Sequence, residues 1–172
     1  MESQGCPLRV ILASLFLYAD TAACTGLKRP AQRMAMTQIT MTKRYRFCAA
    51  HRLHTDFLTP QQNWAAFGKC NNPNGHGHNY VVLVTVISAA GAAGSRPEDL
   101  DRVVEEVIVS RFDHHDLNED PAFSETTTTG ENLVKLIWDL LVDKLPPGSL
   151  KKVGVIETRD NYFEYAAPAA VR

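Results

Sequence analysis

The segment from Cys70 to Tyr80 restricts the fold of this chain more than any other, because it places a thiol and two imidazoles just ahead of an apolar run. His76 and His78 are separated by one residue, so in an extended segment their side chains point to the same side. Two imidazoles supply half of the ligands of a tetrahedral metal site. The fold must therefore bring at least one further ligand to this segment from another part of the chain.

A third imidazole is available upstream, where Phe47, Ala49 and His51 alternate along a short apolar segment. This period of two predicts a strand and directs His51 to its core-facing side, whereas His54 falls near the strand's end. Three histidines without a fourth protein ligand are typical of a catalytic zinc site, which leaves one position for water or substrate. Copper, iron and nickel also accept imidazole, so zinc is inferred as the default for a non-redox site. The alternative is a chance His-x-His pair on a solvated loop.

Composition describes one soluble globular domain, because the 172 residues are 45% hydrophobic and 22% charged. The net charge of -1 provides no broad basic surface for nucleic acid, so no nucleic-acid partner is expected. Lys43, Arg44, Arg52 and Lys69 flank the histidine segments and are candidates for contacting the phosphates of a small molecule. The alternative for each of them is an ordinary solvated charge.

The four cysteines, at positions 6, 24, 48 and 70, show no spacing typical of a disulfide framework. Cys48 is predicted to be a small core residue. Cys70 lies in a polar loop beside Lys69, where positive charge would lower the thiol pKa and make the sulfur reactive. A working thiolate favours a reducing compartment, so we expect a cytoplasmic protein.

Residues 1–40 are predicted to be a leader or a disordered extension, separate from a domain at 41–172. An apolar run at 10–19, followed by small residues through Cys24, resembles a secretory signal and is too short for a membrane span. The match is poor because Asp20 interrupts the run and several later methionines offer alternative starts. A cleaved leader, a disordered extension and an over-long gene model therefore remain open, and no membrane partner is expected.

The remaining sequence predicts two strands, two helices and two further strands. A β-branched run follows His78, and helical spacing begins after Pro97, where acidic residues favour the helix N-terminus. A capping box of Thr128 and Glu131 is expected to open the second helix. The expected elements are strands near 44–53 and 79–87, a polar connection at 59–75, helices at 97–112 and from 128, and strands at 150–158 and 162–165. This order predicts an α+β fold with an antiparallel sheet and two helices on one face.

Asp113 and His114 lie where the first predicted helix ends. A carboxylate beside an imidazole holds its tautomer and stabilises its protonated form, as a proton shuttle requires. The alternative is a polar helix terminus without a chemical role.

Glu157 continues the face of a predicted strand that carries Val153 and Val155. Burying a carboxylate without a partner is costly, so we expect this side chain to be paired or to bind a ligand. A carboxylate can accept two parallel N–H bonds from a planar amidine-like group such as a 2-aminopyrimidine ring. The alternative is an edge-strand glutamate that faces water.

Over residues 45–165 the chain resembles the 6-pyruvoyltetrahydropterin synthase family. The resemblance is carried by five stretches: Phe47-Cys-Ala-Ala-His51-Arg-Leu-His54, the run from Phe67 to Tyr80 with Cys70-Asn-Asn-Pro-Asn-Gly-His76-Gly-His78, Asp113-His114 with Leu117-Asn118, Gly130-Glu131-Asn132 with Ile137-Trp138, and Glu157-Thr158. It implies a T-fold (tunnelling fold) subunit whose β-β-α-α-β-β sheet joins two others in a ring to form a barrel. Two stacked rings would form a homo-hexamer, a dimer of trimers.

The resemblance also implies a role for each candidate site residue. His51, His76 and His78 would bind one zinc ion per subunit, and Cys70 would be the general base. The implied relay and substrate-contacting residues are Asp113 and His114 for proton transfer, Glu157 for catalysis and for anchoring the pterin ring, and Thr129 and Glu131 for further substrate contacts. Magnesium is implied only as an aid to handling the triphosphate.

The reaction implied is the conversion of 7,8-dihydroneopterin triphosphate to 6-pyruvoyl-5,6,7,8-tetrahydropterin and triphosphate, in tetrahydrobiopterin biosynthesis. One alternative is the related 6-carboxytetrahydropterin synthase of deazapurine biosynthesis, in which the gap between cysteine and histidine is typically shorter than the five residues that separate Cys70 from His76. A second alternative is a non-catalytic zinc- and pterin-binding paralogue. It is suggested by residues 88–97, which are poor in strand formers and predict a weakened hairpin or a flexible loop.

Overall fold

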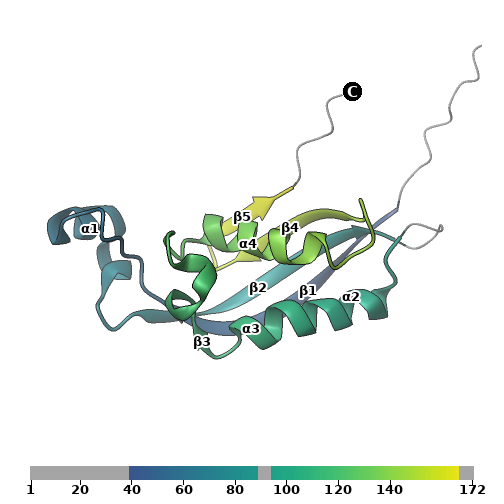
Figure 1. The fold of residues 1–172 in the computed structure, drawn as a ribbon, viewed down its shortest axis with the longest axis horizontal. Coiled ribbons are helices and arrows are strands. Elements are labelled where there is room, and N and C mark those ends of the chain that lie inside the picture. Colours follow the sequence, from purple (N-terminus) through teal and green to yellow (C-terminus); the bar gives the residue numbers. More distant parts are fainter. Residues whose placement is uncertain (1–38, 89–93, 167–172) are drawn as a thin grey trace, which may run out of the picture. The chain divides into compact units, whose positions relative to one another are not determined.

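A five-stranded sheet forms the centre of the computed structural model, which describes residues 39–88 and 94–166. The strand order is β3-β1-β2-β4-β5, with β1 at Thr40–His51, β2 at His76–Ile87, β3 at His115–Asp116, β4 at Leu150–Ile156 and β5 at Tyr162–Tyr165 (Figure 1). The β1–β2, β2–β4 and β4–β5 pairs are antiparallel, as predicted. The sheet is nevertheless mixed, because the two-residue β3 pairs in parallel with Ala49 and Ala50.

Two helical runs cover one face of the sheet, which confirms the predicted α+β layer. The first comprises α2 (Pro97–Val104), a π-helical turn (Glu105–Val109) and α3 (Ser110–Phe112), and the second is α4 (Gly130–Val142). Their apolar side chains and those of alternate strand positions form one buried cluster, including Val82, Val84, Val153, Val155, Leu100, Ile108, Leu133 and Ile137. Each such side chain contributes about 1.5–3 kcal/mol when fully buried.

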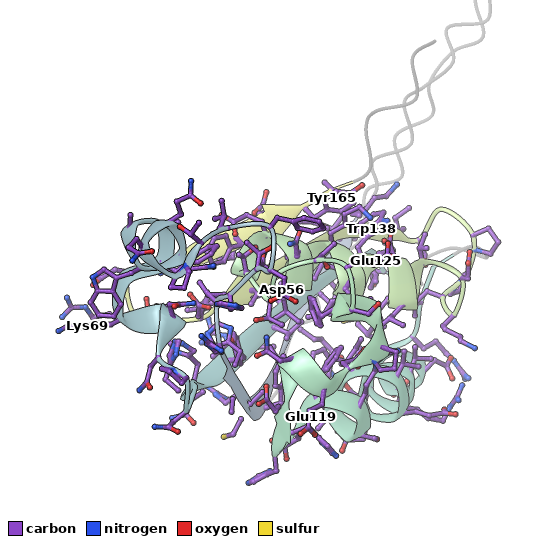
Figure 2. The ribbon with its side chains drawn as sticks, turned by 60° about the vertical axis from the view of Figure 1, so that its left-hand side comes forward. Asp56, Lys69, Glu119, Glu125, Trp138 and Tyr165 are labelled. Carbon is purple, nitrogen blue, oxygen red and sulfur yellow. The ribbon has the colours of Figure 1, made fainter. Side chains whose placement is uncertain are left out.

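Aromatic rings join α4 to the edge strand β5. Trp138 and Tyr165 meet with their ring centroids 5.4 Å apart, and both labels lie together in Figure 2. Phe163 of β5 packs against the same buried cluster. The helix α4 is therefore held against β5.

The start of α4 differs from its prediction by one residue. Thr129 is the N-cap, and its hydroxyl accepts a hydrogen bond from the backbone N–H of Asn132 at 3.4 Å. Thr128 is instead buried, and its hydroxyl donates to the carbonyl of Arg52 at 3.3 Å. The predicted capping box of Thr128 and Glu131 was wrong because the Thr128 side chain is engaged in a tertiary contact.

The connection between β1 and β2 contains a helix that the sequence reasoning missed. It forms α1 (Pro60–Phe67), followed by a 3-10 turn (Gly68–Asn71). Thr59 and Gln62 make a reciprocal capping box, with Pro60 in the first turn, and this pattern was available as a signal in the sequence. Two shorter 3-10 turns, Leu117–Glu119 and Pro121–Phe123, follow β3.

Some of the expectations lie outside the described residues. The predicted leader falls almost wholly within 1–38, and half of the predicted loop at 88–97 falls within 89–93. At the borders of that loop, Ser88 and Ser95 form an isolated bridge. Within the part of the chain that the structure describes, no helix has both the length and the apolar character needed to cross a bilayer.

Candidate metal centre

Three histidines meet at the end of the β1–β2 pair. The register sets His51 opposite His76 and Ala49 opposite His78, so all three imidazoles project from the helix-covered face. Their ligand nitrogens lie within 4.8 Å of one another, and the Nε2 atoms of His51 and His76 are 3.1 Å apart. Two nitrogens that bind one tetrahedral zinc at about 2.0–2.1 Å are about 3.3 Å apart. The three histidines predicted from the sequence are therefore placed where they could hold one metal ion.

Backbone contacts prepare His51 for this role. The ring is 1% exposed, and its Nδ1 donates to the carbonyl of Thr128 at 2.9 Å, which leaves the lone pair on Nε2 toward the cluster. Burial lowers the pKa of His51, although the bond to Thr128 acts in the opposite direction. Burial also lowers the pKa of His78. Both shifts favour the neutral imidazole, which is the form that binds metal.

The lowered pKa values predict how the stability of the metal-free protein depends on pH. An unfolded histidine titrates near 6.5, so below this pH the unfolded chain binds more protons than the folded one and the free energy of unfolding decreases. We expect the urea midpoint of metal-free protein to fall between about pH 7.5 and about pH 5.5, where carboxylates titrate little. His51→Gln should flatten this dependence. An unchanged slope in that variant would show that His51 does not contribute.

Glu157 directs its carboxylate toward the three histidines. Its Oε1 atom lies 3.7 Å from His51 Nε2, and the side chain is 11% exposed. Asn161 donates to Oε2 at 3.4 Å, and the Glu157 backbone N–H donates to the Asn161 carbonyl at 3.2 Å. Burial raises the pKa of the neighbouring Tyr80 hydroxyl, and the charge of Glu157 raises it further. The alternative of a water-facing edge glutamate was therefore wrong.

Backbone and side-chain hydrogen bonds join the turn that carries Cys70 to the segment that follows His51. The Leu53 backbone N–H donates to the Cys70 carbonyl at 2.9 Å, and Asn71 donates through Nδ2 to the Leu53 carbonyl at 2.7 Å. Arg52 adds a bond from Nε to the Asn71 carbonyl at 3.1 Å. Cys70 is half-buried, and its charge is the smallest of the causes that raise the pKa of the Tyr80 hydroxyl.

The prediction that Cys48 is a core residue was wrong. It is exposed rather than part of the core, and its Sγ donates to Asn79 Oδ1 at 3.0 Å. The reason is the strand period, because Phe47 and Ala49 occupy the covered face and the residue between them must face the other way.

Asp113 and His114 are in hydrogen-bond contact, with His114 Nδ1 2.8 Å from Asp113 Oδ2. The other carboxylate oxygen accepts from the Cys48 backbone N–H at 2.7 Å, and this bond, followed by His114, lowers the pKa of Asp113. The His114 side chain is 79% exposed. No hydrogen bond or ion pair among the described residues joins this pair to the three histidines, although His114 and His78 both line a hollow of about 430 Å³.

The remaining candidates differ in the contacts that they make. Thr129 is used as the α4 cap, while Glu131 is exposed in the first turn of that helix. The Nζ atom of Lys43 lies 2.6 Å from Oδ2 of Asp101, and this salt bridge joins β1 to α2. Lys69 is exposed and projects outward at the edge of the molecule in Figure 2.

Comparison with known proteins decides the family. The model of the 6-pyruvoyl tetrahydropterin synthase family matches residues 40–168. The chain belongs to this family. It is similar to the 6-pyruvoyl tetrahydrobiopterin synthase of Homo sapiens, at 45% identity over 132 residues that cover 74% of this chain and 91% of the relative. It is also similar to the 6-pyruvoyl tetrahydrobiopterin synthase of Drosophila melanogaster, at 40% identity over 133 residues that cover 74% of this chain and 79% of the relative.

Solved structures agree with the family membership. The 6-pyruvoyl tetrahydropterin synthase of Caenorhabditis elegans is 35% identical and superposes with a TM-score of 0.71, covering 77% of this chain and 98% of that one. An uncharacterized protein of Wolinella succinogenes, 18% identical with a TM-score of 0.54, shares the fold. The T-fold subunit expected from the resemblance is thereby confirmed.

Proposed function

We propose that this chain is a zinc-dependent 6-pyruvoyl tetrahydropterin synthase that converts 7,8-dihydroneopterin triphosphate to 6-pyruvoyl-5,6,7,8-tetrahydropterin and triphosphate. The observation that carries the proposal is the convergence of His51, His76 and His78 in a chain whose relatives carry that name. The donor set suits zinc, because three neutral imidazoles leave one tetrahedral position for substrate. When bound, the ion polarises side-chain oxygens of the substrate and so acidifies the adjacent C–H bonds.

The side chains and backbone groups around the three histidines take the other roles in the proposed reaction. Thr128 orients His51 by holding its Nδ1–H. Cys70, a half-buried free thiol on the turn that is bonded to Leu53, accepts a proton from the substrate side chain. Glu157 anchors the pterin ring, since Oε2 makes only a 3.4 Å bond to Asn161 and is available to accept N–H donors. Thr129 and Glu131 contribute further contacts at the start of α4.

Proton transfer is completed by Asp113 and His114. Asp113 is fixed by the Cys48 amide and in turn holds His114 Nδ1, so Nε2 of the exposed ring is free to exchange a proton. The sheet ends in the short edge strands β3 and β5. Closure into a ring of three subunits, and stacking of two rings into a hexamer, would cover such edges. We place the enzyme in the cytoplasm, where Cys70 would stay reduced.

The proposal is tested by incubating purified protein with dihydroneopterin triphosphate and identifying the product by mass spectrometry. We expect the 6-pyruvoyl product together with triphosphate, and loss of turnover when a chelator removes the metal. Magnesium added back alone should not restore the reaction. A 6-carboxy product would assign the chain to the deazapurine branch instead, and zinc-loaded protein without any product would indicate a non-catalytic paralogue.

A further inference from the structure

A phenyl ring occupies the space that a side chain on the first residue of α4 would fill. A Cβ atom on Gly130 would lie 2.1 Å from Cε2 and 2.2 Å from Cδ2 of Phe163. These separations are far shorter than the contact distance of two carbon atoms. Phe163 is half-buried and packed against the core, so moving the ring would disrupt this packing. Gly130 and the Phe163 ring therefore exclude a side chain from this position.

The contact lies two residues from the group that orients the metal ligand. Thr128, whose carbonyl accepts the bond from His51 at 2.9 Å, is separated from Gly130 only by the cap Thr129. Thr128 is itself 1% exposed. A displacement of Gly130 would therefore be passed directly to the Thr128 carbonyl and to the imidazole that it holds.

The same ring lies on the strand that pairs with the segment leading to Glu157. Phe163 pairs with Val155 in the β4–β5 hairpin, and Glu157 follows Val155 by two residues on the same face. The hairpin closes at the bond between the Glu157 N–H and the Asn161 carbonyl. Pushing the ring away from α4 would thus also shift the strand that leads to Glu157.

We propose that Gly130 and Phe163 form a positioning pair for the metal centre. The Phe163 ring packs directly on Gly130, which has no side chain. This contact fixes how closely the first turn of α4 approaches β5, and with it the position of the Thr128 carbonyl that binds His51. Neither residue is one of the three ligand residues, and the effect is exerted through Thr128. The inference rests on the proposed function, because it requires that the three histidines bind zinc.

The test is the affinity of purified full-length variants for zinc, measured by competition with a chromophoric chelator. Gly130→Ala is expected to weaken zinc binding about 10- to 100-fold, the range found when a group supporting a metal ligand is lost. The double variant Gly130→Ala/Phe163→Ala should bind zinc more tightly than Gly130→Ala alone, because the ring no longer opposes the methyl group. If Gly130→Ala does not fold, Phe163→Ala tests the pair from the other side and should also bind zinc more weakly than the wild type.

Two controls separate positioning from general destabilisation. Val84→Ala removes a buried side chain in the middle of β2 and should lower stability while zinc affinity stays at the wild-type value. Gly154→Ala adds a methyl group to β4, where it meets the exposed Tyr162, and should also leave zinc affinity unchanged. Wild-type affinity in Gly130→Ala would overturn the inference. A wild-type protein that takes up no zinc would overturn the proposed function itself, and the two failures are therefore distinguishable.

Discussion

Replacing Cys70 by alanine is expected to lower kcat for the synthase reaction by about 100- to 10,000-fold, the range for loss of a general base. The metal content and the thermal stability should stay near those of the wild type. The physical reason is that the thiol is half-buried and is not among the three ligand groups. The turn that carries it is held through the backbone carbonyl of residue 70 and the Asn71 side chain, which the substitution leaves intact.

The chain offers a matched control for this variant. Cys48 is the other described cysteine; its side chain is exposed, its Sγ donates to Asn79 Oδ1, and its bond to Asp113 comes from the backbone N–H, which alanine keeps. Cys48→Ala should retain wild-type turnover. Steady-state kinetics on both variants, with zinc measured in the same samples, checks the assignment. Equal activity of Cys70→Ala and Cys48→Ala would remove the thiol from the mechanism.

Replacing His76 by alanine is expected to release the metal and with it all turnover. His76 stands directly opposite His51 in the sheet, and its Nε2 atom is 3.1 Å from that of His51. Its Nδ1 atom is buried and has no hydrogen-bond partner among the described residues. Two remaining imidazoles would hold zinc far more weakly than three.

The loss should be visible without any assay of activity. Zinc stabilises the folded wild-type chain by mass action, so adding zinc raises its melting temperature. His76→Ala should lose this response, while His115→Ala, which changes an exposed histidine outside the cluster, should keep it. Full zinc occupancy of purified His76→Ala would refute the ligand set.

The sequence predicted the centre well where strand periodicity decided the outcome. The alternation of Phe47, Ala49 and His51 and the spacing of His76 and His78 each place side chains on one face, and the antiparallel register joins the two faces. Glu157 followed from the same rule, because it continues the buried face of Val153 and Val155. These predictions needed only local geometry and one strand pairing.

Tertiary contacts account for what the sequence did not show. Thr128 and Thr129 are equally good capping residues. The choice between them depends on the hydrogen bond that the buried Thr128 hydroxyl donates to the Arg52 carbonyl. The parallel pairing of β3 depends on where the chain returns after α3. The contact of Gly130 with Phe163 joins residues far apart in the sequence, so no local pattern could predict it. The capping box of α1 was the exception, since its residues are adjacent and could have been recognised.

The proposed function requires one metal ion shared by three imidazoles, and X-ray absorption spectroscopy of the zinc-loaded protein tests this requirement most directly. We predict one zinc per chain, with about three imidazole nitrogens and one further oxygen or nitrogen at about 2.0–2.1 Å. A sulfur scatterer at about 2.3 Å would contradict the account, because it would make Cys70 a ligand and close the position reserved for substrate. A protein that binds no zinc would contradict it entirely.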